Sequence, residues 1–303
     1  MDKPLVSMVV NNYNYGQFLP EAINSALNQT YPHTEVIVVD DGSTDNSREI
    51  IASYGDQIVP VLKENGGQAS AFNAGFAASQ GEIICFLDSD DIFLPNKVAE
   101  VVIAFERHGD IGCCFHPLRL VDNDTGRLLN SSDEGSSREW DLRPHIRRGK
   151  LPKGEGLGFT PPATSGLCFK RTLLRQIFPM PEASSVAISD NYIKFMAFAL
   201  TKGFYLGEVL ALQRIHGDNI YTFSGDDKLR ARIRILTAYW MRAKLPATER
   251  FANKLFAAGI GTYWRAGGLE TAYAEVVDSY LSTVSIPKKL EIVLRAFYHR
   301  LKP

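Results

Sequence analysis

The amino-acid sequence predicts an α/β fold in which a mostly parallel central sheet is flanked by helices and followed by a helical C-terminal extension. Over the first 120 residues, short apolar runs alternate with segments of helical pattern. This alternation is typical of a parallel sheet covered on both faces. From residue 227 to the end the pattern is helical throughout. At 303 residues, the chain is long enough for one large domain with an appendage.

Five apolar runs are expected to form the strands of the sheet. They cover residues 5–10, 36–39, 58–62, 83–87 and 111–115. The intervening helices are expected over residues 18–28, 45–54, 68–79 and about 95–108. Pro95 suits the first turn of the last of these helices.

The segment between residues 122 and 225 has weaker signals. Asp-Thr-Gly at 124–126 indicates a hairpin turn, and the polar segment 131–137 is expected to be mobile. Residues 190–201 favour a helix, and 204–212 favour one strand or a pair. We therefore predict one domain over residues 1–225, with halves 1–120 and 121–225, and a helical extension over 226–303.

Charge is unevenly distributed along the chain. The net charge is −1, which argues against a general nucleic-acid binder. Residues 228–303, however, carry 14 Lys and Arg against 5 Asp and Glu, a net charge of +9, whereas residues 1–227 have a net charge of −10. The basic segment suits contact with a membrane or a polyanionic acceptor, and it equally suits a solvated helical face.

The final helix combines a basic and an apolar face. Its apolar stripe comprises Leu290, Val293, Leu294, Phe297 and Leu301. The surrounding positive charges are Lys288, Lys289, Arg295, Arg300 and Lys302. Such a helix either lies on a membrane surface or packs its stripe against the domain.

The four cysteines, Cys85, Cys113, Cys114 and Cys168, lack CxxC spacing and are expected to be small buried residues in a reducing compartment. No signal peptide is recognisable, and no stretch approaches the roughly 18 apolar residues that span a bilayer. A cytoplasmic protein is therefore expected, with peripheral contact at the inner face of the membrane as an option.

Polar residues follow three of the predicted strands, at positions 11–13, 40–43 and 88–91. Ligands of parallel sheets bind at the carboxyl ends of strands. In the third cluster, Asp88, Asp90 and Asp91 would repel one another unless a divalent cation lay among them, and carboxylates suit Mg²⁺ or Mn²⁺. In the second, Asp41 could accept hydrogen bonds from a base or a ribose. Both clusters also fit turns that cap the following helix.

These segments resemble the family 2 glycosyltransferases, which have the GT-A fold. The matching segments are 6–14, 25–31, 38–45, 65–68, 72–75, 81–82 and 86–91. A weaker resemblance extends through 164–166 and 214–217 to about residue 220. The resemblance implies a metal-assisted, inverting transfer from a nucleotide-sugar, with UDP the usual nucleotide. The acceptor would be a carbohydrate, a lipid-linked carrier or a protein.

The resemblance also implies a role for each matching donor-site residue. Asn11 would flank the nucleotide base, and Asp41 would read it. Asp88 would lie near the ribose and the metal. Tyr13, Gly67 and Ser89 fall in the same motifs and would complete the nucleotide-sugar site.

Three further residues carry the expected chemistry. Asp90 would ligate the metal, and His216 would approach the metal or the diphosphate. Asp190 falls where the family has its catalytic base, which removes the acceptor hydroxyl proton. Two positions depart from the family pattern, because Ser189 replaces the Glu of a Glu-Asp pair and Phe72 stands where an Arg is frequent.

Other nucleotide-binding classes are disfavoured. No GxGxxG follows the first strand, and no P-loop motif occurs. The glycines at 154, 156 and 158 lead into Thr160-Pro161-Pro162 and indicate a flexible acceptor loop rather than a dinucleotide fingerprint. The remaining alternative is a catalytically inactive nucleotide-sugar-binding or scaffold protein of the same fold.

Overall fold

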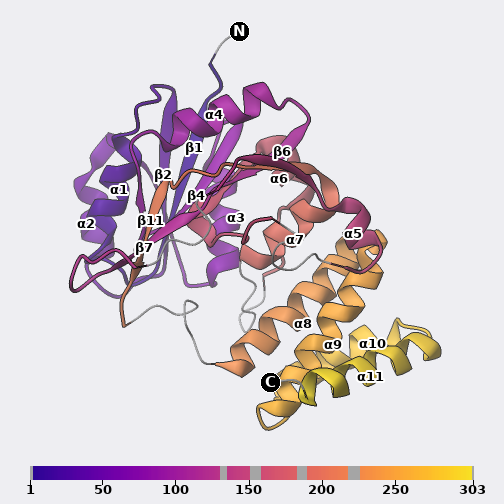
Figure 1. Cartoon of the computed structure of the whole chain (residues 1–303). Coiled ribbons are helices and arrows are strands. Elements are labelled where there is room, and N and C mark those ends of the chain that lie inside the picture. The colour runs from indigo at the N-terminus through magenta and orange to yellow at the C-terminus, as the bar shows by residue number, and fades with distance from the viewer. Residues whose placement is uncertain (1–2, 130–134, 151–157, 183–189, 218–225, 302–303) are drawn as a thin grey trace.

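The computed structural model describes residues 3–129, 135–150, 158–182, 190–217 and 226–301. Its centre is an eight-stranded sheet in the order β3-β2-β1-β4-β9-β6-β10-β8 (Figure 1). A smaller sheet has the order β5-β11-β7. The predicted α/β class, with a mostly parallel sheet between helices and helices at the C-terminus, is confirmed.

The first half of the large sheet is parallel. It contains β1 (Val6–Asn12), β2 (Thr34–Asp41), β3 (Val59–Lys63) and β4 (Ile83–Asp88), with β1 between β2 and β4. Every residue of β1 is buried, as expected for a strand covered on both faces. The register pairs Asn11 with Asp88, so the polar ends of β1 and β4 are adjacent.

Two cores cover the two faces of these strands, because neighbouring residues of a strand point to opposite faces. Val9 and Val39 face one core, whereas Met8 and Val10 face the other. The helices between the strands are α1 (Leu19–Leu27), α2 (Ser47–Ser53), α3 (Gln68–Ala78) and α4 (Lys97–Arg107). Helix α3 lies close to β1, because a Cβ on Gly75 would come 2.3 Å from Cγ1 of Val9.

The second half of the sheet is mixed. Strands β6 (Ile111–Phe115) and β10 (Lys202–Tyr205) are parallel to each other, whereas β9 (Leu167–Lys170) is antiparallel to both β4 and β6. Strand β8 (Arg138–Asp141) closes the edge beside β10. The helices of this part are α5 (Arg143–Arg147), α6 (Arg171–Ile177) and α7 (Asp190–Leu200). The short 3₁₀ helices among the described residues are η1 (Gly55–Gln57), η3 (Thr164–Gly166) and η4 (Pro246–Thr248).

The predicted strand region 204–212 divides into two strands that belong to different sheets. Strand β10 lies in the large sheet, and β11 (Ala211–Ile215) pairs with β5 (Ile92–Phe93) and β7 (Leu118–Asp122). The predicted turn after β7 is confirmed, because Gly126 has φ of 64° and its N–H donates to the Asp122 carbonyl at 2.9 Å. Strand β11 brings the segment ending in His216 back to the carboxyl end of β4.

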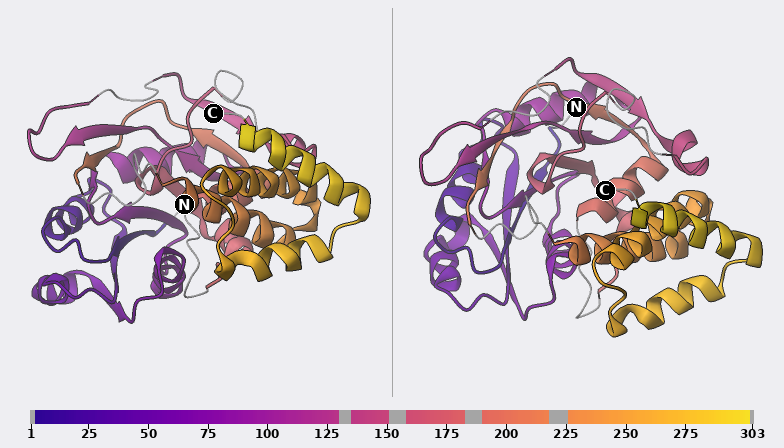
Figure 2. Two further views of the ribbon diagram at one scale, coloured as in Figure 1. Left: turned by 90° about the horizontal axis from the view of Figure 1, so that it is seen from below. Right: turned by 60° about the horizontal axis from the view of Figure 1, so that its bottom comes forward.

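The C-terminal residues form four helices, namely α8 (Asp227–Lys244), α9 (Glu249–Arg265), α10 (Thr271–Ser282) and α11 (Ile286–Leu301). They gather on one side of the sheet (Figures 1 and 2). Their core is continuous with that of the sheet, since one buried cluster joins Phe86 of β4 to Phe256 of α9. No helix within the described ranges is long and apolar enough to cross a membrane.

Helix α11 does not bury its predicted apolar stripe against the domain, which was one of the two alternatives for this helix. Ile292 and Ala296 are the buried residues of this helix, whereas all five residues of the predicted apolar stripe are exposed. Lys302 lies outside the described residues. The four cysteines are buried and free, as predicted.

Candidate active site

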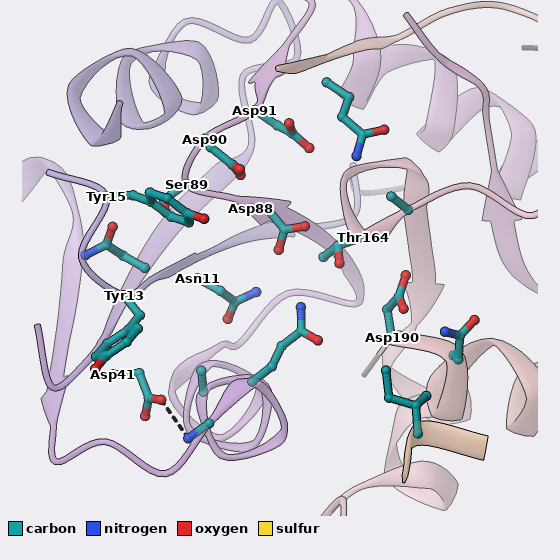
Figure 3. A pocket seen from close by; sticks show the side chains of 18 of the residues that line it. Asn11, Tyr13, Tyr15, Asp41, Asp88, Ser89, Asp90, Asp91, Thr164 and Asp190 are labelled. Atoms are coloured by element: carbon teal, nitrogen blue, oxygen red, sulfur yellow. Dashed lines mark hydrogen bonds between the residues drawn. The ribbon is translucent and has the colours of Figure 1, made fainter. Parts of the chain in front are cut away.

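A cavity of about 460 Å³ opens at the carboxyl ends of β1, β2 and β4 (Figure 3). Its lining also includes residues of η3, α7, β11 and α8. Eight of the nine predicted site residues line this cavity: Asn11, Tyr13, Asp41, Gly67, Asp88, Ser89, Asp90 and Asp190. The ninth, His216, is not part of the lining but contacts Asp90.

Asn11 is arranged to meet a ligand. It lies at the end of β1 and is 8% exposed, yet neither polar atom of its side-chain amide has a hydrogen-bond partner among the described residues. A buried polar group without a partner is costly. Its backbone carbonyl accepts from Ser89 N–H at 3.1 Å. This hydrogen bond joins β1 to residues 88–91, which we call the acidic loop. The Ser89 hydroxyl also lacks a partner within the described part of the chain.

Asp41 holds the loop that contains Gly66 and Gly67 in place through hydrogen bonds. Its carboxylate accepts from Lys63 Nζ at 2.6 Å, from Gly66 N–H at 3.0 Å and from Gly67 N–H at 2.7 Å, the last drawn in Figure 3. Gly67 has φ of 81°, a conformation that favours glycine. The structure therefore gives Asp41 a scaffolding role beside the predicted contact with a base.

Buried polar groups hold the acidic loop in place through hydrogen bonds. Ser165 Oγ donates to Asp91 Oδ2 at 2.6 Å and accepts from Asp88 N–H at 3.1 Å, while Arg214 N–H donates to Asp91 Oδ1 at 3.1 Å. Lys97 is fully buried and donates to the Ser165 carbonyl at 2.7 Å. Asp91 thus anchors the loop, and it lines the cavity together with Asp88 and Asp90 (Figure 3).

Burial and mutual repulsion raise the pKa values of two carboxyl groups in this loop. Burial, followed by the charges of Asp90 and Asp190, raises the pKa of Asp88 well above its usual range. Burial, Asp90 and Asp88 do the same to the pKa of Asp91. A cluster of this kind favours the arrival of positive charge.

The residues present fit a divalent cation that is completed by a ligand. Asp90 Oδ2 and His216 Nε2 lie 3.1 Å apart, and two ligands that are each about 2.1 Å from an octahedral cation lie roughly 3 Å apart. The described residues contain no group of three or more His, Cys, Asp or Glu that could hold a metal by itself. Mg²⁺ sites with few protein ligands use substrate phosphates for the rest. The rings of Tyr15 and Phe18 pack against His216 and fix its orientation.

Asp190 begins α7 on the opposite side of the cavity from Asp41 (Figure 3). Its carboxylate accepts from Lys194 Nζ at 2.9 Å, one helical turn later. Lys194 is 7% exposed and also donates to the Pro162 carbonyl at 2.9 Å. The pair therefore fixes Asp190 beside the segment that precedes η3.

Several lining residues were not singled out from the sequence. Tyr15, Thr164, Asn191 and Gln213 lie close in sequence to the motifs that were. Helix α8 adds a different group, Leu229, Arg230 and Ile233, which no motif marks. Arg230 pairs with Asp227 at 2.9 Å and is the one Lys or Arg among the described lining residues.

The two departures from the family pattern have different outcomes. Phe72 is fully buried, with its ring centroid 4.9 Å from that of Phe86, so this position belongs to the core. Ser189 lies outside the described residues, as do 151–157 of the predicted acceptor loop and 131–134 of the polar segment.

Comparison with known proteins agrees with the geometry. The model of the family "Glycosyl transferase family 2" matches residues 7–177. An uncharacterized glycosyltransferase of Nostoc sp. is 38% identical over 218 residues, which cover 71% of this chain and 66% of the relative. Glycosyltransferase GlyG of Streptococcus pneumoniae is 48% identical over 98 residues, which cover 31% of this chain and 33% of GlyG. The chain thus matches less than two thirds of the length of these relatives.

Two solved structures share the fold. TarS of S. aureus, residues 1–349 in complex with UDP-GlcNAc, has a TM-score of 0.62 at 17% identity, covering 96% of this chain and 79% of TarS. The mannosyltransferase PcManGT of Pyrobaculum calidifontis, in complex with GDP-Man and Mn²⁺, has a TM-score of 0.51 at 18% identity, covering 98% and 85%. With its fold, its cavity and a family match over more than half its length, the chain belongs to glycosyl transferase family 2.

Proposed function

We propose that this protein transfers a sugar from a nucleotide-sugar donor to an acceptor hydroxyl with inversion at the anomeric carbon. The observation that carries the proposal is the arrangement of one cavity, in which Asp190 faces the donor-side carboxylates Asp88 and Asp90. Three polar clusters from separate strands meet there, and the amide of Asn11 is buried without a partner in the described structure.

The donor is proposed to be a UDP-sugar. Asn11 and Tyr13 would flank the base, Asp41 and Gly67 would form its far edge, and Asp88 with Ser89 would contact the ribose. TarS binds UDP-GlcNAc, which supports uridine, whereas PcManGT binds GDP-Man, which makes guanosine the competing nucleotide.

Asp90 and His216 would hold Mn²⁺ or Mg²⁺ together with the donor diphosphate. When bound, such a cation neutralises the charge that develops on the departing nucleoside diphosphate. The exposure of Asp90 is only 9%, so the charge would act in an environment partly shielded from water, where electrostatic interactions are stronger.

Asp190 would act as the general base. The acceptor oxygen forms a bond to the anomeric carbon while the bond from that carbon to the diphosphate oxygen breaks, and its electron pair leaves with the diphosphate. The hydroxyl proton passes to the Asp190 carboxylate. Attack from the side opposite the leaving group inverts the anomeric configuration.

The acceptor is proposed to be a carbohydrate, free or lipid-linked, or a protein. Residues 1–225 would form the catalytic domain, with donor and acceptor halves that meet near residue 120, and residues 226–303 the extension. We place the protein in the cytoplasm, with peripheral contact at the inner face of the membrane.

A binding panel tests the donor and the metal. UDP, GDP and dTDP, with their common sugars, are added in Mn²⁺ or in EDTA, and binding is measured by calorimetry and thermal shift. We expect one nucleotide series to bind, in Mn²⁺ only. If a folded sample binds none of them, the protein is a degenerate family member with a scaffolding role.

The variant Asp190→Asn separates binding from chemistry. We expect donor affinity to stay close to that of the wild type, while transfer, or slow hydrolysis of the donor, is lost. Wild-type turnover by this variant would remove Asp190 from the role of base.

A further inference from the structure

Helix α11 presents an apolar face to solvent. We define the α11 face by its exposed large apolar residues, Ile286, Leu290, Val293, Leu294, Phe297, Tyr298 and Leu301. These are seven of the eleven exposed large apolar side chains that the described residues include. Leu294 and Leu301 are 70% and 81% exposed. Single exposed apolar residues are ordinary, but a contiguous group on one element marks an interaction surface.

Most of the α11 face points away from the rest of the protein, although the ring of Phe297 packs on Trp264 of α9 with centroids 4.9 Å apart. At 3.6 residues per turn, its seven residues span an arc of roughly 140°, whose centre lies roughly 150° from the direction of Ile292 and Ala296. Those two residues are buried where α11 packs on α9. A Cβ on Gly261 of α9 would come 2.4 Å from the Ala296 carbonyl, so the two helices are in close contact. Figures 1 and 2 show α11 at the outer side of the extension.

Basic residues lie on both sides of the α11 face, directly at its border on one of them. By the same helical geometry, Lys289 and Arg300 border one edge, whereas Glu291 borders the other and Lys288 and Arg295 lie beyond it. Lys288 pairs with Glu249 of α9 at 2.6 Å. The helix includes one acidic residue, Glu291, which pairs with Arg295 at 2.8 Å. The segment 228–303 as a whole carries a net charge of +9.

We propose that the α11 face docks on an anionic lipid bilayer, with the helix lying in the plane of the interface. An apolar arc beside lysine and arginine is the pattern of helices that insert shallowly among headgroups. The positive charge of Lys289 and Arg300 at one border, and the net charge of +9 of the segment 228–303, complement anionic headgroups. At 16 residues, or roughly 24 Å, the helix is too short to span the bilayer.

This inference deepens and rests on the proposed function, because it assigns the surface by which the transferase would meet a lipid-linked acceptor. It also gives the basic extension a second role, lipid docking, besides forming part of the cavity wall. Helix α8 contacts the cavity, and α11 packs on α9, which packs on α8. The docked face and the site are therefore connected through three helices that pack on one another.

Vesicle co-sedimentation tests the proposal with the full chain. The probes are phosphatidylcholine vesicles with and without phosphatidylglycerol. We expect binding to the anionic vesicles that weakens with added salt, and little binding to pure phosphatidylcholine. The double variant Leu290→Glu/Leu294→Glu should bind about tenfold or more weakly, because two exposed leucines no longer enter the apolar layer.

A matched control is Leu62→Glu/Leu128→Glu, which places the same charges at two leucines that are 51% and 57% exposed elsewhere on the surface. It should bind vesicles like the wild type. Equal binding of the α11 variant and the wild type, no binding of the wild type, or equal binding to both kinds of vesicle would overturn the proposal. So would a wild-type dimer that the α11 variant dissociates, because the face would then join two copies of the chain.

Donor binding distinguishes this failure from failure of the proposed function. The thermal shift produced by nucleotide and Mn²⁺ should be the same in the wild type and in the α11 variant, since the substituted residues are remote from the cavity lining. Vesicle binding without any donor binding would refute the transferase and leave the lipid surface standing.

Discussion

The buried ion pair between Lys194 and Asp190 allows us to predict how much a substitution of Lys194 lowers the free energy of unfolding. The side chains are 8% and 13% exposed, and their atoms approach to 2.9 Å. In Lys194→Met, Asp190 loses its cation and the Pro162 carbonyl loses a donor. Removing one partner of a buried pair costs about 3–5 kcal/mol. Asp190 faces the cavity, where water can solvate it, so we expect a loss of about 2–3 kcal/mol in the free energy of unfolding.

A double-mutant cycle separates the ion pair from the rest of the lysine. Lys194→Met, Asp190→Asn and the double variant are unfolded in urea at neutral pH. In the Asp190→Asn background, the lysine still bonds to Pro162, so its removal should cost about 1 kcal/mol, leaving a coupling of about 1–2 kcal/mol. Lys202→Met is the matched control, because its ion pair with Asp110 is exposed and should matter little.

The same variants report on catalysis. Lys194→Met should keep donor affinity, because Lys194 is not among the residues that line the cavity, and should lower turnover about tenfold or more through misplacement of Asp190, the proposed base. Zero coupling in the cycle, with wild-type turnover in Lys194→Met, would refute the claim that this lysine positions Asp190.

Three further predictions follow from other parts of the chain. Asp90→Ala should lose the Mn²⁺-dependent part of donor affinity in calorimetry, and unchanged affinity would remove Asp90 from the metal site. Burial would raise the pKa of Asp40, but hydrogen bonds, from Ser43 and Arg48 among others, lower it overall. Its stabilising contribution is therefore complete above the unfolded pKa of about 4 and is lost as the pH falls through the lower folded value. Asp40→Asn should accordingly be less stable than the wild type at pH 7 and lose less on acidification, and parallel melting curves across pH would contradict this. Gly75→Ala should cost about 1–3 kcal/mol, because the new methyl would overlap Val9, and Val9→Ala should cost less in that background than in the wild type, as measured by urea unfolding.

The first 120 residues were predictable because their signals are local. Each buried strand is a continuous apolar run, and each ends in polar residues where the chain leaves the core. The parallel arrangement then brings Asn11, Asp41 and Asp88 to one edge. The cavity residues of this half followed from that topology and from the motifs together.

The second half was less predictable because its elements depend on distant partners. Strand β9 has four residues and exists because it fits between β4 and β6. The segment 204–212 suits one strand or a pair, but the sequence does not indicate that its two ends pair with different sheets. The buried Lys97 is invisible in the sequence for the same reason, since its partner, the Ser165 carbonyl, is 68 residues away.

In the helical extension, the apolar periodicity of the sequence predicts the helices but not which of their faces pack against the rest of the protein. The apolar stripe of α11 is regular, yet the residues that pack on α9 are Ile292 and Ala296 on another side of the helix. On α8, the pattern predicts a helix but not that Leu229 and Ile233, four residues apart on one face, end up at the cavity. That outcome depends on the docking of α8 against α7, the helix that begins with Asp190. Because Asp190 and this wall of the cavity rest on two helices that pack together, a change in the extension would alter the space beside the proposed base. The extension therefore forms part of the candidate active site, although it lies outside the residues that the family pattern matches.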